Sequence, residues 1–399
     1  MPAFDSASLA ERWSRFASSE EIVLDDPFVL EKLTRSAQTR DVVGRHLIGI
    51  RQALGRLPEP VAARYRPWCL DEAFYRFGCE AFYQHLIIFW VGNALRYRPD
   101  LAELDHIFVS RQIIRPSALN STPRIKFDAD VSFLVYPAPG IFWLYELMGA
   151  LSQEMDSRAP VEAKLEEYLL YILAYRAYEA SANWRSAYAI DHLIDEIVQR
   201  GNAPVLGHPV SDSSAALAAS VENFIVNHEI AHALLEHMPG RAEASVMESE
   251  ADALAIELML IGRVPDAALL EGTTVTVRVP DFPLIGYLCL NFWGMFRETA
   301  EWRAASFLAN TPAQRDQIRT RISQLTQARV DRIKAVKHLS RIEASTYAKS
   351  LRNAGTRLND RLANLHVNSD RAVDIVRLAR SLAECNYEAL RQEILRSPN

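Results

Sequence analysis

The chain of 399 residues contains only four cysteines, which are scattered without any C-x-x-C pair. A disulfide framework or a zinc site built from thiolates would need paired or clustered cysteines, so the sequence favours neither. Glycine and proline are not in excess, which argues against a fibrous or disordered chain. We therefore expect a globular protein with reduced thiols, located in the cytoplasm.

Long apolar runs and a secretory signal are also missing. The first residues include Asp5 and Glu11 and show no apolar core bounded by a cleavage site. The most apolar stretches are residues 86–91, 133–151 and 282–296. They are too short or are interrupted by proline and glutamate, whereas a spanning helix needs about 20 apolar residues. We expect core segments here, a soluble protein and no membrane partner.

Positive charge is concentrated in the last quarter of the chain. Residues 310–399 hold 17 lysines and arginines against 9 acidic residues, a net charge of +8. Because the whole chain has a net charge of −6, residues 1–309 have a net charge of −14. The basic region lacks the interleaved aromatic residues that are typical of nucleic-acid-binding surfaces. We expect a solvated, arginine-rich helical region, and the pattern argues against nucleic acid as a partner.

Hydrophobic periodicity predicts a mainly helical chain with a small β region. The expected helices cover residues 8–16, 27–35, 41–57, 71–97, 161–200, 212–238, 243–261 and most of the chain from 283 onward. Alternating and β-branched segments predict two to four strands between residues 104 and 137, and another at 273–279. The Pro-Glu-Pro sequence at 58–60 predicts a turn. These elements indicate an α+β fold that is mostly α-helical.

One helix carries an H-E-x-x-H pattern, with His228, Glu229 and His232. Two histidines four residues apart lie on the same face of a helix, where both imidazoles can bind a single Zn²⁺. Glu229 lies one step round the helix. From there it can act as general base on water without binding the metal.

The third ligand is expected from the next helix. Pro239-Gly240 ends the first helix, and His232 and Glu248 are each eight residues from Gly240. In an antiparallel hairpin of two helices these residues lie level, as do His228 and Asp252 at twelve residues. The spacing predicts Glu248 as the zinc ligand and Asp252 as the hydrogen-bond partner of His228, with Glu250 as the alternative ligand.

The competing interpretation is a pair of core histidines with structural acids. Both histidines do lie on an apolar stripe of their helix. However, buried charges cost several kcal/mol unless they are paired or bound to a metal, so two histidines facing two carboxylates favour a zinc site.

These residues resemble a known family. His228-Glu-Ile-Ala-His232 followed by Glu248-x-x-Ala-Asp252 is similar to the H-E-x-x-H and E-x-x-A-D motifs of gluzincin-type metallopeptidases. The resemblance is greatest to the HtpX-like and prenyl-protein-protease-like peptidases and to the phage-exclusion peptidase Lit. It covers residues 224–257. Because the chain shows no spanning helices, it resembles the soluble, Lit-like branch more than the membrane-bound members.

The resemblance implies a zincin-like core, in which a small sheet lies over a hairpin of active-site helices. One zinc ion would be bound by His228, His232 and Glu248, and Glu229 would activate water. An edge strand would hold the substrate, and residues 129–136 are the natural candidate for it. The implied division is a helical region at 1–100, a zincin-like metallopeptidase domain at 101–309 and a basic helical region at 310–399.

Two family features are not matched clearly. Such proteins often carry His-Pro followed by Arg downstream, where this chain has Thr311-Pro312 and Arg315. The residue that stabilises the oxyanion is not identified by a motif, and Tyr287 and Arg297 are candidates by position.

The resulting hypothesis is a zinc-dependent endopeptidase that acts on a protein or peptide substrate with Glu229 as general base. One alternative is a non-catalytic, zinc-stabilised interaction or regulatory protein with the same fold. The presence of Glu229 beside the histidines favours the enzyme, because a structural zinc site does not use such a carboxylate. A zinc hydrolase that acts on a non-peptide amide is a third possibility.

Overall fold

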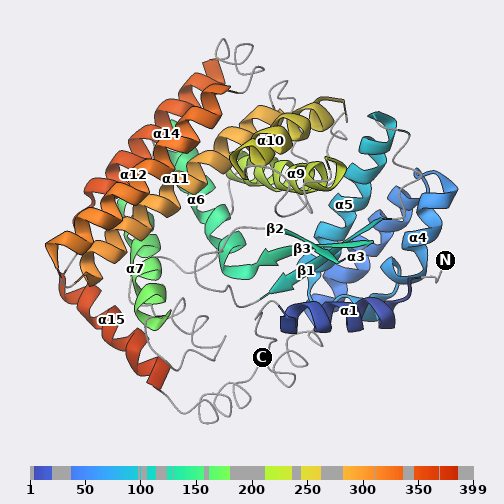
Figure 1. Cartoon of the computed structure of the whole chain (residues 1–399), viewed down its shortest axis with the longest axis horizontal. Helices are drawn as coiled ribbons and strands as arrows, with labels where there is room; N and C mark the ends of the chain where they lie inside the picture. The colour runs from blue at the N-terminus through green and yellow to red at the C-terminus, as the bar shows by residue number, and fades with distance from the viewer. Residues whose placement is uncertain are drawn as a thin grey trace. The chain divides into compact units, whose positions relative to one another are not determined.

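The fold is described here from a computed structural model (Figure 1). The structure describes residues 4–19, 37–97, 99, 106–113, 124–156, 161–179, 212–235, 244–261, 282–309, 311–335 and 346–384, except 129 and 368. These residues form mostly helices and one small three-stranded sheet. The expected α+β class with predominant helix is confirmed at this level.

By their internal contacts, the residues group into two compact units. Unit 1 contains 1–141 and 223–264, and unit 2 contains 142–222 and 265–399. Both units are therefore built from segments that are distant in the sequence. The three consecutive regions expected from the sequence stay a prediction.

Unit 1 combines the sheet with helices from both of its segments. Its elements are α1 (Ser6–Ser19), α3 (Ala37–Leu54), α4 (Glu59–Cys69), the 3-10 helix η1 (Glu72–Phe74), α5 (Gly78–Tyr97), β1 (Ile107–Ile113), β2 (Arg124–Asp128), β3 (Val131–Pro137) and α10 (Ala244–Ile261). The second half of α9 (Asp212–Leu234) also belongs to unit 1, from residue 223 onward.

The sheet has the order β1-β3-β2, so β3 is its central strand. β3 pairs with β1 in parallel and with β2 in antiparallel orientation. Phe133 and Tyr136 are an odd number of residues apart in β3, so their side chains point to opposite faces of the sheet. On one face Phe133 contacts Trp13 and Phe16 of α1, and on the other Tyr136 stacks on Tyr83 of α5 at 3.8 Å between ring centroids. Helices thus cover both faces of the central strand.

The outer edge of β1 is closed by side chains. The backbone N–H groups of Phe108, Ser110 and Gln112 donate to Tyr65 Oη (3.2 Å), Gln84 Oε1 (2.9 Å) and Glu80 Oε1 (3.0 Å), in that order. These three amides alternate along the strand and point away from β3. Because helices α4 and α5 supply the acceptors, β1 has no row of amides ready to pair with another strand.

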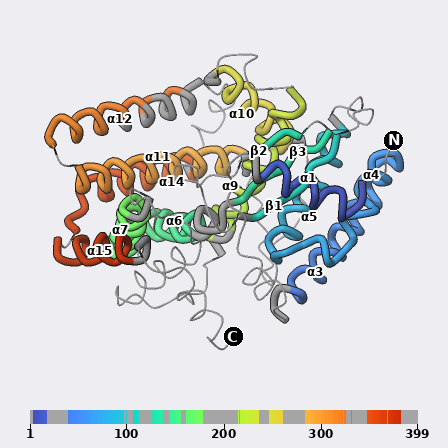
Figure 2. Tube along the Cα trace, turned by 60° about the horizontal axis from the view of Figure 1, so that its bottom comes forward, coloured from blue at the N-terminus to red at the C-terminus, as the bar shows by residue number. Residues whose placement is uncertain are grey.

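Unit 2 is helical in the part that the structure describes. It contains most of α6 (Ala138–Asp156), α7 (Glu162–Glu179), the first half of α9, α11 (Phe282–Leu308), α12 (Pro312–Ala335), α14 (Thr346–Asn364) and α15 (Ser369–Glu384). α11 and α14 run side by side (Figure 2), and α7 packs against α11, α14 and α15. Gly355 of α14 allows this approach, because a Cβ there would lie 2.6 Å from the Phe292 ring of α11.

Two local predictions differ from the structure. The helix expected from residue 71 begins at Gly78, because Asp71 caps the short helix η1 through Ala73 N–H and Tyr75 is extended. The Pro-Glu-Pro sequence expected as a turn starts helix α4, with Pro58 as N-cap and Pro60 in the first turn. Proline is tolerated there because first-turn amides have no acceptor within the helix.

Other predictions fall outside the described residues. They are the helix at 27–35, the part of the helix at 161–200 beyond 179, the Pro239-Gly240 turn and the strand at 273–279. In the described part of the chain, no helix combines the length and the apolar character needed to cross a membrane.

Candidate metal centre

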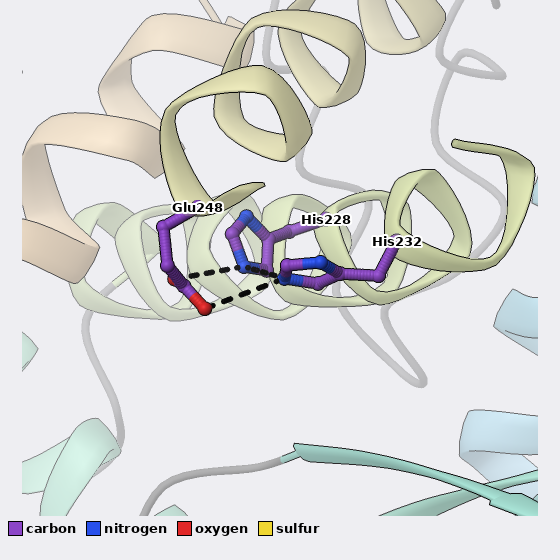
Figure 3. A group of neighbouring side chains, drawn as sticks. All are labelled: His228, His232 and Glu248. Carbon is purple, nitrogen blue, oxygen red and sulfur yellow. Dashed lines mark hydrogen bonds and ion pairs between the residues drawn. The ribbon is translucent and has the colours of Figure 1, made fainter. Parts of the chain in front are cut away.

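Helix α9 brings the two histidines of the H-E-x-x-H pattern to one face. Residues 217–231 of this helix are all buried, so the imidazole of His228 lies in the interior, whereas the side chain of His232 is 12% exposed. His228 and His232 are one turn apart, and their Nε2 atoms lie 3.0 Å from each other (Figure 3). The two rings are almost perpendicular, at 87°.

Helix α10 places a carboxylate, that of Glu248, beside the two Nε2 atoms. Glu248 Oε2 lies 3.5 Å from His228 Nε2, and Glu248 Oε1 lies 3.5 Å from His232 Nε2 (Figure 3). One ligand atom from each of the three residues lies within 4.8 Å of the others, so the group could hold a metal ion. Glu250 is exposed on the same helix and is not part of this group.

Asp252 fixes the orientation of His228. Its Oδ1 atom lies 2.9 Å from His228 Nδ1, and the carboxylate is 1% exposed. A carboxylate beside Nδ1 favours the ring form that carries hydrogen on this nitrogen, which leaves Nε2 as the metal-binding atom. His228 therefore presents Nε2 toward His232 and Glu248.

The charges of the group favour a cation. Burial alone would lower the pKa of His228, but Asp252 and Glu248 outweigh burial and raise this pKa to about 10. Burial would likewise raise the pKa of Glu248, but hydrogen bonds from His228 and His232 hold this pKa far below its ordinary value. A cluster with these shifts stabilises positive charge, which a proton or a divalent cation can supply.

The distances between the donor atoms fit tetrahedral zinc. With ligand atoms about 2.0–2.1 Å from the metal, a tetrahedral site places neighbouring ligand atoms about 3.3 Å apart. The three observed separations are 3.0, 3.5 and 3.5 Å. Two imidazole nitrogens and one carboxylate are also a donor set that zinc commonly uses in catalytic sites.

Glu229 lies beside this group and faces the sheet. Its Oε2 accepts a hydrogen bond of 2.9 Å from the backbone N–H of Ile125 in β2, and the side chain is buried. Burial raises the pKa of Glu229, an effect that the nearby imidazoles of His228 and His232 partly offset. The contact holds one carboxylate oxygen in place and leaves Oε1 as the second acceptor.

Among the described strands, the edge strand near Glu229 is β2, so residues 129–136 are the wrong candidate. Residues 131–137 form the central strand β3, which is paired on both sides and has no open edge. The sequence did contain a signal. β3 is buried from Val131 to Tyr136, as central strands are, whereas β2 alternates charged and apolar residues in Arg-Ile-Lys-Phe-Asp, as edge strands do.

The candidates for oxyanion stabilisation lie elsewhere in the chain. Tyr287 and Arg297 belong to α11 in unit 2, where Tyr287 is fully buried and Arg297 Nε lies 4.0 Å from Glu301. Thr311 and Arg315 are also in unit 2, at the start of α12. The expected role of Tyr287 or Arg297 in oxyanion stabilisation stays a prediction, and Thr311 and Arg315 mark only the position of a motif that this chain does not match clearly.

In comparisons with known proteins, the chain matches no protein-family model, and no curated protein or solved structure is significantly similar to it. The family resemblance therefore depends on the two short motifs, and the functional argument depends on the geometry of the site.

Proposed function

We propose that this protein is a zinc-dependent endopeptidase. The observation that carries the proposal is the convergence of His228, His232 and Glu248 next to Glu229, whose carboxylate accepts a hydrogen bond from an edge strand. A purely structural zinc site needs the ligands but has no use for a buried carboxylate beside them.

In this proposal the three ligands hold one zinc ion, and Asp252 keeps the His228 ring in its binding orientation. A zinc ion held there would act as a Lewis acid on a carbonyl oxygen and would acidify water. The donor set and the interatomic distances given above support zinc over calcium or magnesium, which prefer oxygen ligands.

Glu229 transfers the proton during the reaction. Oε2 is held by the Ile125 amide, so Oε1 accepts the proton from water and later delivers it to the leaving amine nitrogen.

The substrate is proposed to be an extended peptide that pairs with β2. The outward amides of β1 are already bonded to Tyr65, Gln84 and Glu80, so that edge is closed. In β2 the Ile125 amide points away from β3 toward Glu229, and Phe127, two residues on, has its backbone groups on the same edge. A peptide added along this edge would run past Glu229.

The test combines zinc content with cleavage of a diverse peptide library, read by mass spectrometry. We expect about one zinc per chain in the wild type and in Glu229→Gln. Loss of general-base catalysis should lower the cleavage rate of Glu229→Gln by about 10²- to 10⁴-fold. Glu250→Gln, at an exposed glutamate of α10, is the control and should cleave like the wild type.

Two results would contradict the proposal. If the wild-type protein were purified without stoichiometric zinc, the proposed zinc site would be wrong. Stoichiometric zinc together with no cleavage of any peptide would favour the non-catalytic, zinc-stabilised protein.

A further inference from the structure

The turn between β2 and β3 is held by one arginine of the N-terminal helix. Arg12 Nε donates to Asp128 Oδ2 at 2.9 Å, and Arg12 Nη1 donates to Asp130 Oδ1 at 2.7 Å. Arg12 Nη2 also donates to the backbone oxygen of Asp128. The guanidinium therefore bridges both sides of the turn, and its side chain is only 17% exposed.

Helix α1 is itself anchored on the sheet. The rings of Trp13 and Phe16 lie 5.2 and 5.8 Å from the ring of Phe133 in β3, measured between centroids. Leu9, Trp13 and Ala17 are buried in the same unit. Arg12 thus extends from a helix that is itself held in place, so its hydrogen bonds can also hold the β2–β3 turn in place.

The held turn is adjacent to the contact with Glu229. β2 has five residues, and Asp128 at its end is three residues from Ile125, a distance of about 10 Å along the strand. β2 is paired only with β3 among the described strands. A strand that is short and at an edge depends on its end contacts, which here are Glu229 near one end and Arg12 at the other.

We propose that Arg12 is a positioning residue, which acts through β2 to hold the Ile125 amide against the carboxylate of Glu229. The side chain does not touch the metal group. It would set the direction of the Glu229 carboxylate and the position of the edge along which a substrate would pair. The kinetic part of this inference rests on the proposed function, whereas the structural part does not.

The first measurement is hydrogen exchange of the amides at 124–128 in the zinc-loaded protein. In Arg12→Met these amides should exchange about tenfold faster than in the wild type, because the charge-assisted bonds to the turn are lost. Zinc content should stay at the wild-type value. Arg66→Met is the matched control, since Arg66 makes a bidentate pair with Glu59 within α4 and not with a residue of β2.

The second measurement is cleavage kinetics on a peptide that the library experiment identifies. Arg12→Met should lower kcat about 10- to 100-fold, as expected when a catalytic group is misplaced by about 1 Å, and should raise KM, because the edge that pairs with the substrate is less firmly held. Arg12→Lys should restore part of kcat, because lysine supplies the charge but not the two-sided bridge. Asp130→Asn, which removes one ion pair, is the milder variant if Arg12→Met does not fold.

The outcomes separate the two proposals. Unchanged exchange at 124–128 in folded Arg12→Met or Asp130→Asn would overturn the positioning role, whatever the activity. A fall in zinc content equal to the fall in kcat would also overturn it. Faster exchange confined to these amides would support it even if the protein cleaved no peptide, a result that would count against the peptidase alone.

Discussion

Buried carboxylates have different partners in two parts of the molecule. In unit 2, Glu154 is 6% exposed and bonds Arg357 Nε at 2.7 Å and Arg361 Nη1 at 3.1 Å. In the candidate metal centre of unit 1, the buried Asp252 and Glu248, whose side chain is 42% exposed, lie beside imidazoles. Arginine is always charged, whereas histidine is neutral near pH 7 unless its surroundings raise its pKa. The arginine arrangement keeps its positive charge at any pH near neutral, whereas in the histidine arrangement the positive charge is supplied by a proton on His228, whose pKa is raised to about 10, or by a bound cation.

Carboxylates paired with arginine are found in both units, so this difference in partners does not distinguish one unit from the other. Glu80 in unit 1 is buried and bonds Arg76 Nη2 at 2.8 Å, with Arg111 Nη1 at 3.6 Å. This cluster resembles the arginine-balanced arrangement of unit 2. Charge balance by arginine thus occurs in both units, whereas the carboxylates of the α9–α10 group pair with imidazoles.

The largest expected effect comes from removing a proposed ligand. Glu248→Gln should weaken zinc binding by more than the 10- to 100-fold that is typical of losing an outer-shell partner, and cleavage should be lost with the metal. Zinc affinity is measured by competition with a chelator. Glu250→Gln on the same helix should bind zinc as the wild type does. Equal affinity in the two variants would place the third ligand elsewhere.

The arginine-balanced cluster should respond in stability and not in metal binding. Arg357→Met combined with Arg361→Met leaves the Glu154 carboxylate buried without either arginine. We expect a loss of about 2 kcal/mol in the free energy of unfolding, below the 3–5 typical of fully buried pairs because both arginines are about half exposed. Urea unfolding gives the loss, and zinc content should not change. Reduced zinc content would contradict the distinction between the arginine-paired Glu154 cluster and the metal centre.

Acid should affect unit 1 through histidines outside the metal centre. Burial lowers the pKa of His46, His85 and His106 to about 4, from 6.5 in an unfolded chain. Between pH 6.5 and 4 the unfolded chain binds more protons, so the free energy of unfolding should fall as pH falls, by up to about 1.4 kcal/mol per pH unit for each histidine. Denaturant unfolding at several pH values measures this slope. His46→Gln should remove one histidine's share, and an unchanged slope would contradict the assignment.

The last comparison is between two helix glycines, and it includes the smallest expected effect. Gly44→Ala in α3 meets no atom within 4 Å and should stabilise the protein by about 0.5–1 kcal/mol, because alanine is the better helix former. Gly355→Ala in α14 should destabilise it by about 1–3 kcal/mol, because the new Cβ meets the Phe292 ring. Thermal unfolding distinguishes the two signs. If both variants were stabilised, the close packing of α14 on α11 would be wrong.

The spacing of the metal group was predictable because it depends on short-range geometry. Four residues make one helical turn, so His228 and His232 had to share a face once the segment was helical. The pairing of Glu248 with the histidines followed from equal distances to one turn. The structure brings these residues together with Asp252, as the spacing predicted.

The contacts that position Glu229 were not predictable in this way. Ile125 is 104 residues from Glu229, and Arg12 is 116 residues from Asp128. Neither contact leaves a periodic pattern in the sequence, and the order of strands in the sheet cannot be found from any single strand. The alternation of charged and apolar residues in β2 was a signal for the edge that the prediction did not include, and the central strand was mistaken for the edge strand.

The amino-acid sequence alone therefore specified the chemical groups of the candidate site, the mainly helical class and the alignment of two successive helices. These features follow from backbone periodicity over about one to four turns. The three-dimensional fold decided which strand meets Glu229, which edge is closed by α4 and α5, and which helix anchors the turn beside the site. Such choices are set by packing between segments more than a hundred residues apart, because many partners are compatible with one amphipathic strand until the core selects among them.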